Sequence, residues 1–166
     1  MKFGGIDYDA DELNELHRKY KIGDKIIDSD IYISKIISPV ICYSHVDLSG
    51  GKFSFNQELF GKDSHNYFEK IKALCDNSID GLLNEDNNGV WHLHPTRGKN
   101  ILNELKRHFN KKNIDNLPEI YHFALYTDKD IADKSTGKRS PRIHFIVGSH
   151  GMLYPLFYDP YHEINP

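Results

Sequence analysis

The chain has 166 residues, of which 39% are hydrophobic and 27% are charged, and its formal net charge is −3. These values fit one globular domain spanning residues 1–166, and they exclude a second full domain and a scaffold that depends on disulfides. No apolar run approaches the roughly 18 residues of a membrane-spanning helix, and no basic segment followed by an apolar stretch opens the chain. We therefore expect a cytoplasmic protein with no membrane partner.

Charge is divided unevenly along the chain. Acidic residues outnumber basic ones up to Thr96, whereas basic residues are in excess from Arg97 onward. This excess is too small for tight nucleic-acid binding driven by counterion release alone. Any nucleic-acid contact is therefore expected at one local groove.

The N-terminal part predicts a helix followed by strands. Asp9 or Asp11 can cap a helix that runs to about Tyr20, because apolar side chains recur there at three- and four-residue steps. Residues 25–44 are rich in Ile, Val and Tyr and are interrupted by Pro39, which predicts two strands or one bent strand.

The middle of the chain predicts a helix at about 64–76, a polar connector over 76–89 and a short strand over 90–94. Alternation along this strand places His92 and His94 on the same face.

The C-terminal half predicts a helix over 100–109, a strand over 117–127 and a long polar loop over 128–140. Two further strands over 142–147 and 152–159 are joined by a glycine-containing hairpin turn. Together these elements predict an α+β domain with an antiparallel sheet, in which a C-terminal three-strand meander packs with about three helices.

Histidine is the unusual residue of this composition, with ten copies. The familiar catalytic motifs are missing: the stretch 135–138 lacks the glycine spacing of a P-loop, and neither G-x-S-x-G nor H-E-x-x-H occurs. The chemistry has to come from less specific groupings.

The first grouping is the pair His92 and His94. Residues two apart on a strand lie about 6.6 Å apart along it, so the two imidazoles can share a divalent metal ion or bracket a phosphate. In the metal variant, Asp159 or His162 supplies the further ligand. The alternative is two histidines on the solvated face of an edge strand.

The second grouping is Asp159, His162 and Glu163, which directly follow an apolar strand. A rigid sheet can aim such groups into a cleft, and a carboxylate beside an imidazole fixes its tautomer and raises its basicity. The alternative is a turn stabilised by Asp159, with the other two side chains in solvent.

The third grouping is basic: Lys138, Arg139 and Arg142 lie near His144. Arginine's planar fork of donors suits phosphate oxygens. The alternative is an ordinary solvated face with surface ion pairs. Tyr158 is among several tyrosines that suit base stacking or, alternatively, simple packing on a sheet.

Two classes of function fit these groupings. The first is a small phosphodiesterase-type nuclease that favours RNA and uses His162 with His92 or His94 as acid and base. In this class Arg142 contributes to catalysis by holding the phosphate, and the substrate-binding residues are Lys138, Arg139, His144, Tyr158 and Tyr161. A metal-dependent variant uses His92, His94 and Asp159 as ligands of one divalent ion.

The second class is a protein without chemistry of its own, a regulatory, immunity or anti-defence protein that binds a protein partner through aromatic and charged surface. Convergence distinguishes the two classes, because an enzyme must bring its histidines and Arg142 together, whereas a binding protein can scatter them. A small-molecule sensor is a third interpretation, with no motif to support it.

Overall fold

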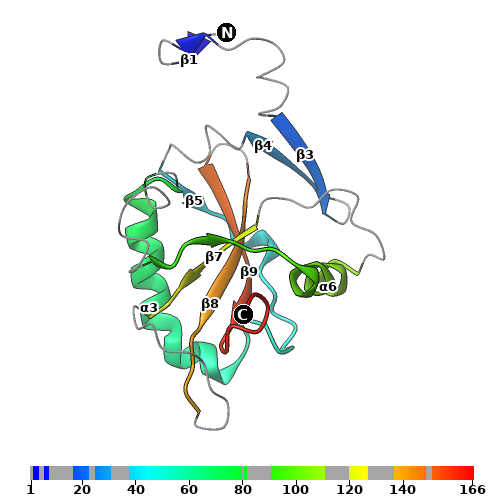
Figure 1. The fold of residues 1–166 in the computed structure, drawn as a ribbon, viewed down its shortest axis with the longest axis vertical. Helices are drawn as coiled ribbons and strands as arrows, with labels where there is room; N and C mark the ends of the chain where they lie inside the picture. The colour runs from blue at the N-terminus through cyan, green and yellow to red at the C-terminus, as the bar shows by residue number, and fades with distance from the viewer. Residues whose placement is uncertain are drawn as a thin grey trace.

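The computed structural model describes residues 38–79, 81, 91–110, 120–126, 137–148 and 151–166, together with the backbone of four strands nearer the N-terminus (Figure 1). Those four strands form two hairpins, β1 (Lys2–Phe3) with β2 (Ile6–Asp7) and β3 (His17–Ile22) with β4 (Lys25–Asp30).

A five-stranded mixed sheet forms the centre of the described structure, with the strand order β5-β9-β8-β7-β6. Its strands are β5 (Val40–Ile41), β6 (His94–Pro95), β7 (Ile120–Ala124), β8 (Arg142–Val147) and β9 (Met152–Asp159). Neighbours pair antiparallel except β5, which runs parallel to β9. A register shift lies between His144 and Phe145 in the β8–β9 pairing.

Two helices pack on the sheet from different sides, α3 (Glu58–Cys75) and α6 (Lys99–His108) (Figure 1). The side chains of Tyr67, Ile71 and Leu74 form the buried stripe of α3, at the three- and four-residue steps of an amphipathic helix. They join an aromatic core that includes Phe123 and Phe145 on one face of the sheet.

The second helix covers part of the other face. Ile101 and Leu105 of α6 pack with Ile146, Leu156 and Phe157 of the sheet in a separate, smaller core. A short 3-10 helix, η1 (Tyr43–His45), lies between β5 and α3 in the chain. Each face of the sheet therefore has its own helix and its own apolar cluster.

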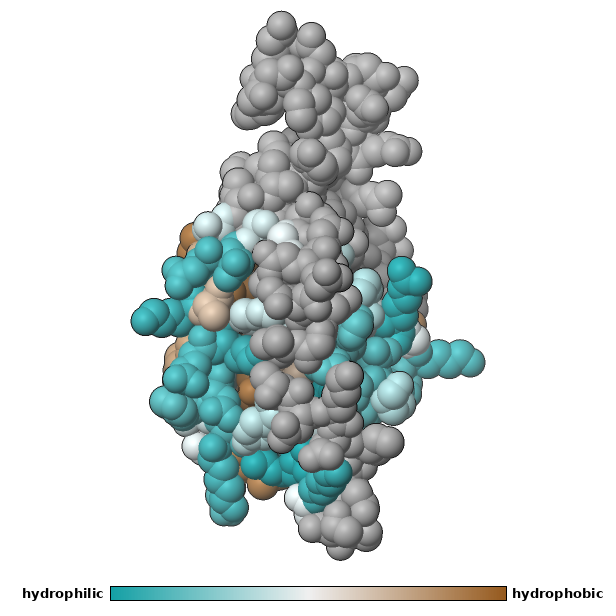
Figure 2. Space-filling model, turned by 60° about the vertical axis from the view of Figure 1, so that its left-hand side comes forward, coloured by the Kyte–Doolittle hydropathy of each residue, from teal (hydrophilic) through white to brown (hydrophobic). Residues whose placement is uncertain are grey.

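Hydrophilic side chains dominate the surface of the described residues that faces the viewer in Figure 2, and brown areas are small. Among the described residues, no helix is both long and apolar enough to cross a membrane.

The α+β class and the three C-terminal strand positions agree with the sequence prediction, as does the helix at α6. The expected antiparallel sheet, built on a C-terminal three-strand meander, is matched only in part. The sheet that the structure describes has five strands and is mixed, because β5 runs parallel to β9. About three helices were expected to pack on it, and the described residues supply two of eight residues or more, α3 and α6.

The helix expected to end near Tyr20 is also wrong, because His17–Ile22 is the strand β3. Its partner β4 begins after two intervening residues, with Ile22 opposite Lys25. Gly23 was interpreted as a helix stop, but a glycine followed by aspartate is also a sequence signal for a two-residue hairpin.

Two boundaries in the middle of the chain also differ. Helix α3 begins at Glu58, six residues before the expected start. The expected strand over 90–94 is replaced by β6 at His94–Pro95, and His92 has a φ of 45°, which is incompatible with a strand. The loop expected over 128–140 lies mostly outside the described residues.

Candidate functional site

Three histidines form a row across the sheet face that carries α6. In the strand register, His94 of β6 is directly opposite His122 of β7, and His122 is directly opposite His144 of β8. Directly opposite residues point to the same face of a sheet, so these rings are neighbours. The ring centroids are 5.9 Å apart for the first pair and 5.2 Å apart for the second.

A pair of opposite charges lies beside this row. Arg142 of β8 is opposite Asp159 of β9, and Arg142 is two residues from His144, so it faces the same side. The Nε2 atom of His144 lies 3.6 Å from Oδ2 of Asp159, and both side chains are fully buried. The row of histidines therefore ends at a buried carboxylate.

Thr96 joins the two inner histidines. It follows His94 by two residues, and its Oγ1 lies 3.0 Å from Nδ1 of His122 and 3.1 Å from Nδ1 of His144. Its backbone amide donates to the carbonyl of Ile120, which fixes Thr96 beside β7. One hydroxyl thus bridges two buried imidazoles.

The C-terminal segment folds back over this face after β9. The carboxylate of Asp159 accepts hydrogen bonds from the backbone amides of Tyr161 and Ile164, at 3.3 and 2.7 Å. This turn brings the ring of His162 to 5.4 Å from the ring of His122. Asp159 therefore organises both the buried end of the row and the segment that carries His162.

His92 completes the grouping, with its ring centroid 6.2 Å from that of His94. Both His92 and His162 have positive φ angles, 45° and 55°. Such left-handed backbone costs free energy in a residue other than glycine, and residues of this kind gather at functional sites. The two histidines that flank the row share this conformation with one other described non-glycine residue, Asn110.

We refer to these eight side chains as the histidine cluster: His92, His94, Thr96, His122, Arg142, His144, Asp159 and His162. The cluster runs from the exposed His94, through the half-buried His92 and His162, to the buried His122, His144 and Asp159. It is open to solvent at one end and dry at the other.

Burial sets the protonation of the cluster. Burial, together with the neighbouring His144 and His162, lowers the pKa of His122 to about 2. Burial and then the charge of Arg142 lower the pKa of His162 to about 4. Burial also lowers the pKa of His144. These three imidazoles are therefore neutral at neutral pH.

The carboxylate of the cluster stays ionised. Burial by itself raises the pKa of Asp159, but its hydrogen bonds with His144 and with backbone amides outweigh burial, and the net shift is downward. Arg142 supplies the opposite charge. Its Nη1 donates to the carbonyls of Ser140 and Pro141, at 3.2 and 3.3 Å, so this guanidinium is held in place beneath the surface.

Arg139 and Tyr158, two of the residues predicted to bind substrate, are not brought to the cluster. Tyr158 points to the α3 face, where its hydroxyl donates to Oδ2 of Asp63 at 2.6 Å. Arg139 donates hydrogen bonds from both Nη atoms to the same buried carboxylate, at 2.5 and 2.8 Å. A strong partner on α3, far away in sequence, therefore holds both side chains on the opposite side of the sheet.

Other predicted binding residues are placed differently. Lys138 is exposed at the start of the segment leading to β8. Tyr161 is half-buried and contributes its backbone amide to Asp159. Of the five, His144 is the one whose ring lies in the row.

Two members of the cluster were missed by the sequence reasoning, His122 and Thr96. Alternation within the predicted strand over 117–127 gives the face of His122 but not its partner strand, which depends on register. Thr96 is two residues beyond His94, and only the actual path of β6 shows that both side chains face the same way.

Among the described residues, no group of three His, Cys, Asp or Glu side chains is arranged to hold a metal ion. The proposed ligand set of His92, His94 and Asp159 is accordingly not assembled there. Asp159 faces His144 and two backbone amides instead.

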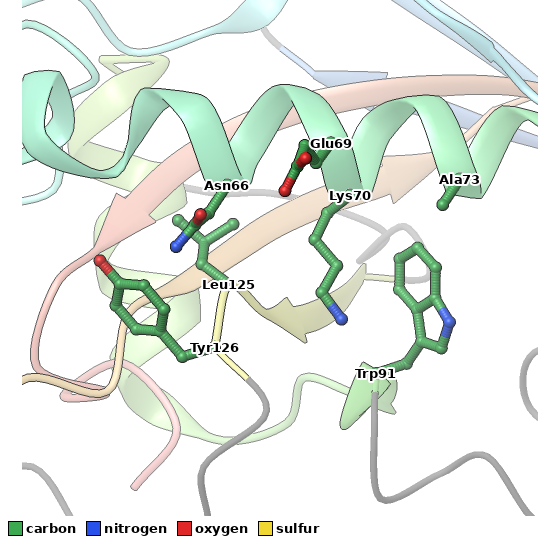
Figure 3. A pocket seen from close by; sticks show the side chains of 7 residues that line it. All are labelled: Asn66, Glu69, Lys70, Ala73, Trp91, Leu125 and Tyr126. Atoms are coloured by element: carbon green, nitrogen blue, oxygen red, sulfur yellow. The ribbon is translucent and has the colours of Figure 1, made fainter.

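A separate pocket of about 470 Å³ lies on the α3 side of the sheet (Figure 3). Lys70 and Trp91 lie at one end of it, with the Lys70 ammonium 4.5 Å from the centre of the indole ring. Asn66 and Tyr126 lie toward the other end. No member of the histidine cluster lines this pocket.

No protein-family model, curated protein or solved structure matches the chain. The chemistry of the histidine cluster is therefore the basis for the function inferred below.

Proposed function

We propose that the protein is a nuclease that cleaves RNA by general acid–base catalysis at the histidine cluster. The observation that carries this proposal is convergence: side chains from β6, β7, β8, β9 and the C-terminal segment meet on one face of the sheet. Several imidazoles around a fixed cation are the groups that acid–base cleavage of RNA requires.

RNA supplies its own nucleophile, the 2′-hydroxyl next to the phosphate. Cleavage needs a base to remove the proton of that hydroxyl, an acid to protonate the leaving 5′-oxygen, and positive charge beside the crowded phosphate. Imidazoles provide the first two and a guanidinium the third. This chemistry explains why RNA fits the cluster better than DNA, which lacks the internal nucleophile.

We assign the base role to His162. Its depressed pKa keeps the ring neutral across the physiological range, and the residue is half-buried, on the C-terminal segment that covers the cluster. Its Nε2 is inaccessible to solvent and makes no hydrogen bond within the described part of the chain. A small shift of the C-terminal segment on substrate binding would expose this nitrogen to a 2′-hydroxyl, which would give it the partner that a buried polar atom requires.

The acid role is assigned to His94, which is exposed at the edge of the sheet where a leaving oxygen can approach. His122 lies between the two, with its ring 5.9 Å from His94 and 5.4 Å from His162. The half-buried His92 beside His94 is the second candidate for this role.

Positive charge comes from two places. Arg142 is buried and anchored by carbonyl groups, so it stabilises a phosphate through its field rather than by reaching out. Arg97 and Lys99 are exposed and directly follow Thr96, where Gly98, with a φ of 110°, turns the chain into α6. These two side chains take the phosphate-binding role that the sequence suggested for Arg139.

A cleavage assay tests the proposal, using labelled RNA, single-stranded DNA and duplex DNA, with and without EDTA. We expect cleavage of RNA, and we expect the His162→Ala variant and the His92→Ala/His94→Ala double variant to lose at least about 100-fold in rate. His65→Ala is the matched control, because His65 is an exposed histidine on α3. EDTA separates acid–base catalysis from metal-dependent catalysis.

Absence of cleavage by the folded parent protein would overturn the nuclease proposal. The second class of function, a binding or inhibitor protein that masks a protein partner, would then take its place. Cleavage that is equally fast in the His162→Ala variant would instead move the reaction away from the cluster.

A further inference from the structure

The buried half of the histidine cluster contains a chain of polar groups in contact with one another. It runs from Asp159 to His144, from His144 to Thr96, and from Thr96 to His122, at 3.6, 3.1 and 3.0 Å. All four side chains are buried, with at most 7% of each residue exposed. Protein groups rather than bulk water therefore decide where the protons in this chain lie.

The hydroxyl of Thr96 limits which tautomers His122 and His144 can adopt together. A threonine hydroxyl has one proton to donate, and it lies between two Nδ1 atoms. If both hydrogen bonds form, at most one of these nitrogens can be an acceptor. At least one of His122 and His144 must then carry its proton on Nδ1.

Asp159 decides which histidine this is. Its carboxylate faces Nε2 of His144, and both groups are removed from solvent. A nitrogen lone pair pointing at a buried anion is unfavourable, whereas an N–H pointing at it is favourable. His144 therefore carries its proton on Nε2, and its Nδ1 is left as an acceptor for the Thr96 hydroxyl.

We infer that Thr96 is a positioning residue, which transmits the orientation set by Asp159 through His144 to His122. The Thr96 hydroxyl donates to Nδ1 of His144, so its oxygen accepts from Nδ1–H of His122. His122 is thereby held in the Nδ1–H tautomer, with its Nε2 lone pair directed away from Thr96. Each N–H and O–H in this chain then points toward Asp159.

This inference deepens the proposed function, and its effect on cleavage rests on that function, although the tautomers do not. The ring of His122 neighbours those of both His94 and His162, and a fixed Nε2 acceptor there presents them with a lone pair, which favours an N–H on the outer ring that faces it. Fixing the tautomer of the central ring thus fixes which of its nitrogens the two outer rings meet.

The test measures the tautomers directly, by two-bond nitrogen–proton NMR correlations of the imidazole rings at pH 7, in the parent protein and two variants. We expect His144 to be protonated on Nε2 and His122 on Nδ1. Thr96→Ser keeps the hydroxyl and should preserve both tautomers. Thr96→Val removes it and should convert His122 to a mixture or to the Nε2–H form.

An Nε2–H tautomer of His122 in the parent protein would overturn the inference, whatever happens in the variants. So would an unchanged Nδ1–H tautomer of His122 in a folded Thr96→Val protein. The parent measurement needs no variant, so a Thr96→Val protein that fails to fold leaves the inference testable.

A parallel cleavage measurement separates this inference from the proposed function. We expect Thr96→Val to lower kcat for RNA at least about tenfold with little change in KM, and Thr96→Ser to restore most of the rate. The expected tautomers without any cleavage would support the positioning role of Thr96 and overturn the proposed nuclease function. Cleavage with the tautomers reversed would support the nuclease function and overturn the positioning role.

Discussion

The two faces of the central sheet handle buried charge in different ways. On the α3 face, the carboxylate of Asp63 receives two nitrogens of Arg139 and the hydroxyls of Tyr126 and Tyr158. On the other face, the carboxylate of Asp159 faces an imidazole at 3.6 Å, and beyond it lie further neutral imidazoles. The first arrangement pairs charge with charge at short range, and the second keeps groups that can exchange protons.

This difference separates a structural role from a chemical one. Short bonds to Asp63 tie α3 to β9 and to the segment before β8, and they hold Arg139 as a permanent cation, since the hydrogen bond to Asp63 raises its pKa. Burial and the hydrogen bonds to Asp63 also raise the pKa of the Tyr126 and Tyr158 hydroxyls. In the histidine cluster, burial lowers the pKa values of His122, His144 and His162, so these rings stay neutral and can accept hydrogen bonds at neutral pH.

The largest effect is expected on the α3 face. Asp63→Ala removes one partner of a buried ion pair and leaves Arg139 uncompensated, which should lower the free energy of unfolding by about 3–5 kcal/mol. Urea denaturation measures this change. The control is Glu58→Gln on the same helix, whose ion pair with Lys62 is exposed and is expected to contribute only about 0.3–0.5 kcal/mol. Equal losses in the two variants would contradict the structural role of Asp63.

The next effect is the pH dependence of the free energy of unfolding that the histidine cluster causes. The folded-state pKa of His122, about 2, lies below the ordinary histidine value of 6.5, so below pH 6.5 the unfolded chain binds a proton that the folded protein does not. The free energy of unfolding should therefore fall as the pH drops, by about 2 kcal/mol between pH 7 and pH 5 from this residue. His162 acts in the same direction, with a smaller contribution because its ring is partly exposed.

Urea denaturation at pH 7, 6 and 5 measures this slope, and His122→Gln should flatten it, while the exposed His65→Ala leaves it unchanged. Asp159 does not contribute in this window. Its pKa is lowered, so its stabilisation is present above the ordinary aspartate pKa of 3.8 and is lost only at more acid pH. A parent protein whose stability is constant from pH 7 to pH 5 would contradict the neutral, buried state of His122.

The smallest effect is expected where the C-terminal segment meets solvent. Lys52 lies 3.0 Å from the carboxylate of Glu163, the residue after His162, but the lysine side chain is 57% exposed. Lys52→Ala should therefore change the free energy of unfolding by less than about 1 kcal/mol. A larger loss would mean that this contact, rather than Asp159, holds the segment that carries His162.

The sequence predicted the strands and the helix whose residues show a clear periodic pattern of apolar side chains. The strands β8 and β9 and the helix α6 follow from alternation and from a three- and four-residue stripe. The strand β3 was missed because Gly23 was taken as the end of a helix that the three- and four-residue spacing before it suggested. Nothing in the sequence near β5 indicates that it pairs parallel to β9.

The candidate site was predictable in part for the same reason. His94 and His162 were proposed from their neighbours in the sequence, but His122 enters the cluster through the register of three strands. Arg139 was assigned to substrate binding because its buried partner, Asp63, is 76 residues away. Pairing across such a distance depends on tertiary packing, which local patterns do not encode.

The most direct test of the central claim is the chemistry of the cleaved ends. One labelled RNA oligonucleotide and the same sequence with 2′-O-methyl groups are incubated with the protein, and the products are analysed by mass spectrometry. Acid–base catalysis by the histidine cluster predicts cleavage of the unmodified RNA with 2′,3′-cyclic phosphate ends, and no cleavage of the methylated strand. Cleavage of both strands, or of neither, would contradict the account.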